Sequence, residues 1–133
     1  MTVTDTEFNG QFGYEIIRDH VLPDILGQNE ADILYWAGKS LARKFPLFTL
    51  DEASDFFRQA NFGELAVEKT AKDEIVFLLK PTKIDQRCFK LEAGFLAQQK
   101  QKIDGFVTEA FEEVFDKKMQ VRITLKWDLR DKI

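Results

Sequence analysis

The fold is decided by residues 64–80, which read ELAVEKTAKDEIVFLLK. Upstream of this stretch, apolar residues recur every three or four positions, as they do in helices, whereas within it the pattern becomes that of strands. We expect two strands at 64–69 and 74–80, joined into a hairpin by the turn at 70–73. The second strand carries IVFLL at 75–79 and is apolar on both faces. We therefore expect helices to cover both of its faces.

Three helices are predicted before this hairpin. The first spans 12–26 and should be kinked or ended near Pro23, and the second spans 29–45. The third begins with the capping-box pattern T-x-x-E at Thr49 and Glu52. The core stripe of the second helix is predicted to contain Ile33, Trp36 or Ala37, Leu41 and Phe45.

After the hairpin, a fourth helix is predicted at 88–102, apolar in its first half and polar in its second. A second hairpin follows, with strands at 106–115 and 120–128 around a turn at 116–118. The side chains of its last strand alternate, and those predicted to point inward are Val121, Ile123, Leu125 and Trp127.

The element order ααα-ββ-α-ββ predicts an α+β fold, in which the two hairpins form a four-stranded antiparallel sheet packed with helices. The length of 133 residues suits one domain, so residues 1–133 are interpreted as a single domain with residues 1–8 disordered. Gly38 and Gly94 fall inside predicted helices, where glycine costs about 1 kcal/mol relative to alanine. Their presence suggests that another backbone approaches closely at both places.

Composition narrows the class of partner. The net charge is -4 and the basic residues are scattered, which argues against nucleic-acid binding because phosphates need a basic face. The longest strongly apolar run, 75–79, is too short for membrane insertion. A single cysteine excludes an intramolecular disulfide, and the N-terminus does not have the pattern of a secretory signal. These features favour a cytoplasmic protein.

Candidates for chemistry are few. The only cysteine, Cys88, and the only histidine, His20, fall in different predicted helices, and neither belongs to a metal-ligand motif. Cys88 is expected to be a buried structural thiol. The acidic cluster at 51–55 is explained by a helix N-terminus, where acids are stabilising, and the cluster at 109–113 by an exposed strand face. We therefore predict no catalytic residues, no metal site, no cofactor and no enzymatic activity.

The chain contains 13 phenylalanines, more than twice the ordinary usage, and they either fill a tight core or line an apolar pocket. The leading hypothesis is a non-catalytic cytosolic domain that binds an apolar small molecule and dimerises. The alternative is a filled-core protein–protein adaptor without a ligand, and an enzyme is a distant third. The predicted ligand-binding residues are Trp36, Phe57, Phe77, Leu79, Phe89, Ala93 and Phe95.

A homodimer is predicted from the run ILYWAG at 33–38, which is nonpolar on every side of one helical turn. Exposed on a monomer, that turn would leave a large apolar patch, so a two-fold interface from the first two helices is expected. The predicted interface residues are Tyr14, Ile17, Val21, Leu34, Tyr35 and Gly38.

Two motifs carry a family resemblance. Residues 88–97, CFKLEAGFLA, have the pattern C-x(3)-E-A-G-F-L-A, and residues 35–42, YWAGKSLA, have the pattern Y-x-A-G-x-x-L-A. Together they resemble the four-vinyl-reductase small-molecule-binding domain, which shares a fold with the Bet-type TRAPP subunits of vesicle tethering. Over about residues 12–128, the chain looks most like the YslB-like family of uncharacterised bacterial proteins.

This resemblance implies an α+β fold, dimerisation through the N-terminal helices and an apolar cavity, and it does not imply an enzyme. Some members of the superfamily bind zinc through cysteines near the last hairpin, but residues 109–121 contain no cysteine here. Nor does any residue match the acylated cysteine of the tethering subunits. The resemblance therefore supports neither a metal site nor a lipid anchor.

Overall fold

The computed structural model, which describes residues 10–133, begins with a series of short helices. Helix α2 (Gln11–Glu15), the π-helical turn η1 (Ile16–Val21) and helix α3 (Leu22–Leu26) follow one another without a break. The single helix predicted at 12–26 is therefore continuous but changes its winding in the middle. Pro23 lies in the first turn of α3, where a missing N–H breaks no helical hydrogen bond. The disorder predicted for residues 1–8 lies outside the described residues.

The remaining elements confirm the predicted order of helices and hairpins. The capping box of Thr49 and Glu52 is present, and the last strand ends at Lys132 rather than Asp128. In chain order these elements are η2 (Gly27–Asn29), α4 (Glu30–Lys44), η3 (Leu50–Glu52), α5 (Ala53–Gln59), β1 (Glu64–Thr70), β2 (Glu74–Lys80), α6 (Lys90–Asp104), β3 (Phe106–Phe115), η4 (Asp116–Lys118) and β4 (Gln120–Lys132).

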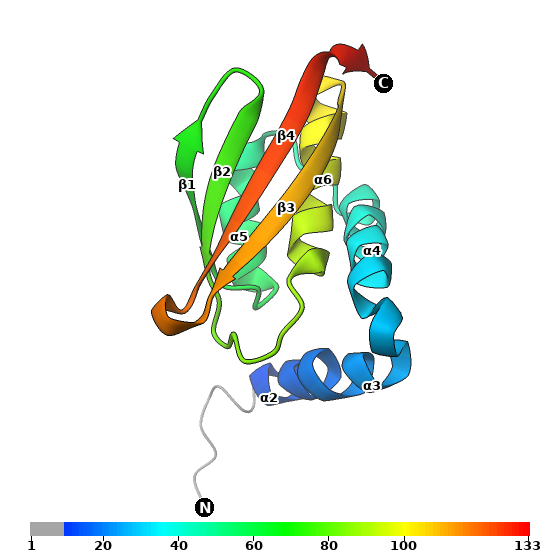
Figure 1. Ribbon diagram of the computed structural model, residues 1–133, viewed down its shortest axis with the longest axis vertical. Helices are drawn as coiled ribbons and strands as arrows, with labels where there is room; N and C mark the ends of the chain where they lie inside the picture. The colour runs from blue at the N-terminus through cyan, green and yellow to red at the C-terminus, as the bar shows by residue number, and fades with distance from the viewer. Residues whose placement is uncertain (1–9) are drawn as a thin grey trace, which may run out of the picture.

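The four strands form one antiparallel sheet in the order β1-β2-β4-β3. Helices α5 and α6 lie behind the sheet, and α4 packs beside α6 (Figure 1). The prediction that helices cover both faces of β2 is therefore wrong. Val76, on the open face, is nevertheless only 6% exposed. Its cross-strand neighbours there are Lys69 and Thr124. Long polar side chains can shield an apolar neighbour with their aliphatic stems, so an apolar residue on this face needs no helix above it.

Helices α4 and α6 cross at two glycines. A Cβ on Gly38 would collide with the carbonyl of Leu91 and lie 2.8 Å from the backbone nitrogen of Phe95. A Cβ on Gly94 would collide with the carbonyl of Tyr35. The close backbone approach predicted at both glycines is confirmed.

This crossing sets which face of α4 is buried. Its buried residues are Leu34, Gly38 and Ala42. Of the two alternatives predicted for the core stripe, Trp36 is wrong because it is 64% exposed, whereas Ala37 is half-buried; the predicted Leu41 packs against the core. At about 100° per residue, Trp36 lies roughly 200° from both Leu34 and Gly38, on the opposite side of the helix. Ile33 and Phe45, which were also predicted to be buried, are exposed.

The outer edge of β3 is shielded by side chains. The Ala110 N–H donates to the Tyr35 hydroxyl at 3.1 Å, and the Thr108 N–H donates to Oε1 of Gln101 at 3.1 Å. At the other edge of the sheet, a register shift interrupts the pairing of β1 after Val67. Such features make the edge of a sheet a poorer template for another strand.

Candidate functional site

Six of the seven predicted ligand-binding residues lie together, each at most 3% exposed, in one hydrophobic core. They are Phe57, Phe77, Leu79, Phe89, Ala93 and Phe95. Trp36 does not join them, because it lies on the outer side of α4. The sequence pattern therefore located the aromatic core correctly except for this one residue.

The core rings contact one another. Phe95 stacks on Phe56 with 4.5 Å between ring centroids, and Phe57 meets Phe62 edge-on at 5.1 Å and Phe95 at 6.0 Å. Five surface hollows among residues 10–133 have volumes between 250 and 540 Å³, and none is lined by any of the seven predicted residues. This geometry is that of a packed core, and binding of an apolar ligand there stays a prediction.

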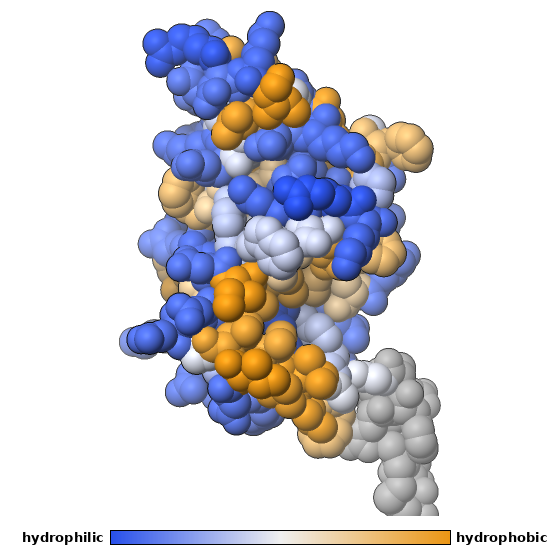
Figure 2. Space-filling model, turned by 90° about the vertical axis from the view of Figure 1, so that its right-hand side faces the viewer, coloured by the Kyte–Doolittle hydropathy of each residue, from blue (hydrophilic) through white to orange (hydrophobic). Residues whose placement is uncertain are grey.

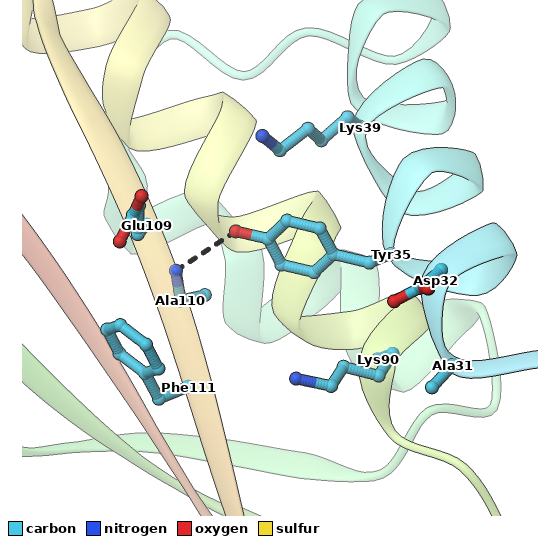
Figure 3. A pocket seen from close by; sticks show the side chains of 8 residues that line it. All are labelled: Ala31, Asp32, Tyr35, Lys39, Lys90, Glu109, Ala110 and Phe111. Atoms are coloured by element: carbon cyan, nitrogen blue, oxygen red, sulfur yellow. Dashed lines mark hydrogen bonds between the residues drawn. The ribbon is translucent and has the colours of Figure 1, made fainter.

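One hollow of about 290 Å³ opens between α4, α6 and β3 (Figure 3). Tyr35 lies at its centre, with the ammonium groups of Lys39 and Lys90 at 4.8 and 5.8 Å from the ring centroid. Burial raises the pKa of Tyr35, so the phenol stays neutral and accepts the Ala110 hydrogen bond. The lining residues are Ala31, Asp32, Tyr35, Lys39, Lys90, Glu109, Ala110 and Phe111.

That hollow has little capacity for catalysis. Its two lysines are balanced by two acids, and Lys90 is already paired with Glu112 at 2.9 Å. A neutral tyrosine engaged in an edge-strand hydrogen bond is neither a base nor an activated nucleophile. The hollow is therefore better explained as the gap left where Tyr35 shields β3.

A buried polar network joins the N-terminal helices to the segment before α6. The guanidinium of Arg18, 2% exposed, donates to Glu92 at 2.6 Å, to the Cys88 carbonyl at 2.7 Å and to the Tyr14 hydroxyl at 2.6 Å. Burial alone would lower the pKa of Arg18, but the charge and hydrogen bond of Glu92 outweigh burial and raise it. Arg18 therefore remains charged at every ordinary pH.

A second pair lies beside the first. Arg87 holds both carboxylate oxygens of Asp19, at 2.7 and 2.8 Å, and its guanidinium lies 5.4 Å from the ring centroid of Tyr14. Burial raises the pKa of Tyr14, so its hydroxyl remains neutral beside the two cations. Sequence reasoning missed this network because its partners are 68 and 74 residues apart. Its only local signal was Glu92, a charge inside the otherwise apolar stretch 91–97.

Large apolar side chains are exposed along α2 to α4. We call them the apolar surface; Figure 2 shows apolar side chains gathered over α3 and the beginning of α4. Ile25 is 72% exposed, Trp36 64% and Ile17 51%. The apolar surface comprises Phe12, Ile16, Ile17, Ile25, Ile33 and Trp36.

The predicted dimer-interface residues are divided by the structure. Ile17 is on the apolar surface, and Val21 and Tyr35 are partly buried. Leu34 and Gly38 are buried against the body of their own chain, so their assignment to an intermolecular interface is corrected. Tyr14 faces the polar network rather than the solvent side of α2. These differences follow from how each helix is rotated about its axis. The glycine crossing fixes the rotation of α4, and the buried Arg18 fixes that of η1.

Cys88 is partly buried and lies two residues before α6, less enclosed than predicted. Burial raises its pKa, which disfavours the thiolate. Within residues 10–133, no three His, Cys, Asp or Glu side chains gather into a group that could hold a metal ion. Nor does any helix there combine the length and the apolar character that crossing a membrane requires.

Comparison with known proteins places the chain in a family. It is 42% identical over 129 residues to uncharacterized protein YslB of Bacillus subtilis (strain 168), an alignment that covers 92% of this chain and 87% of the relative. Among solved structures, a vinyl-4-reductase family protein from Methanocaldococcus jannaschii has a similar fold, with a TM-score of 0.56 and 18% identity over 96% of this chain and 84% of that one.

An H-NOX structure aligns with a TM-score of 0.49 and 14% identity, over 96% of this chain and 75% of that one. The likeness to the archaeal protein confirms the α+β fold that the two sequence motifs implied. Residues 11–126 match the family described as "Protein of unknown function (DUF2507)". Together with the YslB relative, this match confirms the family resemblance: the chain belongs to the DUF2507 family.

Proposed function

We propose that this protein is a non-catalytic cytosolic interaction domain that forms a homodimer through its apolar surface. The exposure of Ile25, Trp36 and Ile17 on consecutive helices is the observation that carries this proposal. Burying a large aliphatic or aromatic side chain gains about 1.5–3 kcal/mol, so a contiguous group of such residues favours association.

A second copy of the chain is the partner that fits best. A two-fold interface pairs a surface with itself and therefore suits a face that is mainly apolar, where no like charges are brought together. An interface of ordinary size needs about 20–30 residues on each side. The helical segment from α2 to α4, residues 11–44, is long enough to supply them.

Other functions receive less support. The aromatic core contains rings in mutual contact, which favours the filled-core alternative over a resident apolar ligand. The raised pKa of Cys88 and the neutral Tyr35 argue against nucleophilic chemistry. We therefore place self-association first and treat binding of an apolar small molecule in the core as the less favoured alternative.

The test is sedimentation velocity with native mass spectrometry on wild type, Ile25→Glu and Trp36→Glu. Both side chains are exposed on the isolated monomer, so neither substitution should disturb its fold. We expect a wild-type dimer and, in each variant, a dimer dissociation constant raised about 100-fold, equivalent to about 2.7 kcal/mol. Phe48→Glu is the matched control, since Phe48 is 91% exposed but outside the apolar surface. It should dimerise as wild type does.

A wild-type protein that sediments as a monomer up to about 100 μM, a concentration at which even a weak dimer would form, would refute the proposal. Equal weakening of the dimer in Phe48→Glu would also count against this particular surface. A monomer that retains a different protein through Ile25 and Trp36 would support the adaptor alternative instead.

A further inference from the structure

Residues 10–26, here called the arm, contain α2, η1 and α3 and run across one end of the molecule (Figure 1). Its three helical pieces contain a single buried residue, Arg18. By comparison, α6 contains seven, five of them apolar or glycine. The arm therefore lacks the fully buried apolar side chains that normally fix a helix to a core.

Polar contacts hold the arm in place instead. Arg18 is bonded to Glu92 and to the Cys88 carbonyl, and Asp19 is bonded to Arg87. A weaker ion pair joins Glu15 to Lys83 at 3.8 Å. The ion-pair and hydrogen-bond partners named here lie within residues 83–92, and Tyr14 adds a partly buried contact with the aromatic core.

Some hydrogen-bonding groups in this attachment have no partner within the described part of the chain. Nε of Arg18, Nη1 of Arg87 and Oε2 of Glu92 are buried without a hydrogen-bond partner among residues 10–133. The free-energy cost of removing these charged groups from water cancels much of the gain from their mutual attraction. A buried donor or acceptor without a hydrogen-bond partner raises that cost further. The free energy that holds the arm to the body is therefore smaller than four buried charges suggest.

The arm also has a hinge. Gly27, which follows α3 directly, has φ 54° and ψ -133°, a conformation that side chains disfavour, and no atom lies within 4 Å of where its Cβ would be. Turning at Gly27 has to break two backbone hydrogen bonds, from the Gly27 N–H to the Pro23 carbonyl and from the Glu30 N–H to the Gly27 carbonyl, but it meets no neighbour at the Cβ position. The π-helical turn η1 carries Arg18 and Asp19, and such turns occur frequently at functional sites.

We propose that the arm undocks from the body as a unit, turning about Gly27, while the sheet and α4 to α6 stay folded. Undocking exposes Glu92 and Arg87 and uncovers the ring of Phe62, 5.9 Å from the Arg18 guanidinium at the edge of the aromatic core. The docked arm therefore covers that end of the core, and the undocked arm leaves it open; we call this movement the gate. This device does not depend on dimerisation.

Hydrogen exchange followed by mass spectrometry tests this gate on the full chain. At a protein concentration where sedimentation shows a monomer, amides of the arm should exchange about 100-fold faster than amides of α6. Arm exchange should also be nearly independent of low concentrations of denaturant, because little surface is exposed. Arm and α6 amides with equal protection and equal denaturant dependence would overturn the proposal, whatever the oligomeric state.

Three variants separate undocking from general loss of stability. Arg18→Met leaves Glu92 buried and unpaired, so arm exchange should accelerate further while α6 exchange changes much less. The double variant Arg18→Met with Glu92→Met replaces the pair by apolar side chains and should slow arm exchange below wild type. Arg58→Met removes only exposed ion pairs with Asp55 and Glu64 and should leave the arm unchanged.

If a Met variant fails to fold, the wild-type comparison of arm and α6 still decides the proposal. A double variant that folds and exchanges faster in the arm than Arg18→Met would contradict the explanation by unsatisfied charges. Parallel acceleration of arm and α6 in Arg18→Met would also contradict it, because it would mean that the arm opens only with the whole domain.

Discussion

Replacing Gly94 with alanine tests the helix crossing on which the fold depends. The new methyl group would collide with the carbonyl oxygen of Tyr35 and lie 3.0 Å from its carbonyl carbon. Both obstructing atoms belong to the backbone of α4, so no side-chain rotation can relieve the contact. The two helices must separate, or α6 must shift against the sheet.

The magnitude follows from two opposing effects. Overpacking a close-packed site costs about 1–3 kcal/mol, and a rigid backbone obstacle places this site at the upper end of that range. Alanine also favours a helix over glycine by about 1 kcal/mol. The net loss is about 2 kcal/mol, and for a domain of this size it should lower the unfolding temperature by about 6–10 °C.

Thermal and urea unfolding of wild type, Gly94→Ala and Gly13→Ala provide the measurement. Gly13 is an ideal control because it is exposed in α2 and nothing lies within 4 Å of its Cβ position. Gly13→Ala should be neutral or more stable by up to about 1 kcal/mol. If Gly94→Ala unfolds at the wild-type temperature or above, the close backbone contact between α4 and α6 does not exist.

Two further predictions concern charge and the core. Burial raises the pKa of Asp19, but the hydrogen bonds and charge of Arg87 outweigh it and hold that pKa below its usual value. The charged Asp19 therefore stabilises the folded protein above about pH 4, and this stabilisation is lost as the pH falls through the folded-state pKa. The difference in unfolding free energy between wild type and Asp19→Asn should accordingly shrink from about pH 4 to pH 2. For the core, Ala93→Leu should lower stability by about 1–3 kcal/mol, and small aromatic or acyl compounds should give wild type no thermal shift. A compound that stabilises wild type but not Ala93→Leu would instead establish an apolar pocket.

The elements were predictable from sequence because their signals are local. The alternation of Val121, Ile123 and Leu125 fixed the inner face of β4, and all three are 0% exposed. The capping box of Thr49 and Glu52 likewise marked the start of a helix and is present. Such patterns depend on neighbouring residues and on the geometry of a single element.

The phase of α4 was not predictable from hydrophobicity. The helix meets α6 through Gly38 and Ala42, small residues that contribute little apolar surface, while its larger apolar residues, Ile33 and Trp36, face outward. A stripe chosen by hydrophobic bulk therefore mixes outward residues with Leu41, which packs against the core. The glycine itself was the better guide, since its presence in a helix indicated the backbone contact that defines the inner face.

The candidate site depended even more on the third dimension. Nothing in the spacing of Arg18, Asp19, Arg87 and Glu92 indicates that they pair, because the chain brings them together only after the helices have packed. The sequence did indicate an exposed apolar region on the first helices, but it assigned Leu34 and Gly38 to that region rather than Ile25 and Trp36.

The shielded edges of the sheet bear on how this protein avoids aggregation. An edge strand with free N–H groups can template growth of a fibril, and the hydroxyl of Tyr35 and the amide oxygen of Gln101 occupy two of those donors on β3. The same strand carries Glu109, Glu112 and Glu113, so two copies of β3 aligned with one another would bring carboxylates together. Once folded, two molecules are therefore disfavoured from joining edge to edge through β3, which lowers the tendency of the native protein to aggregate.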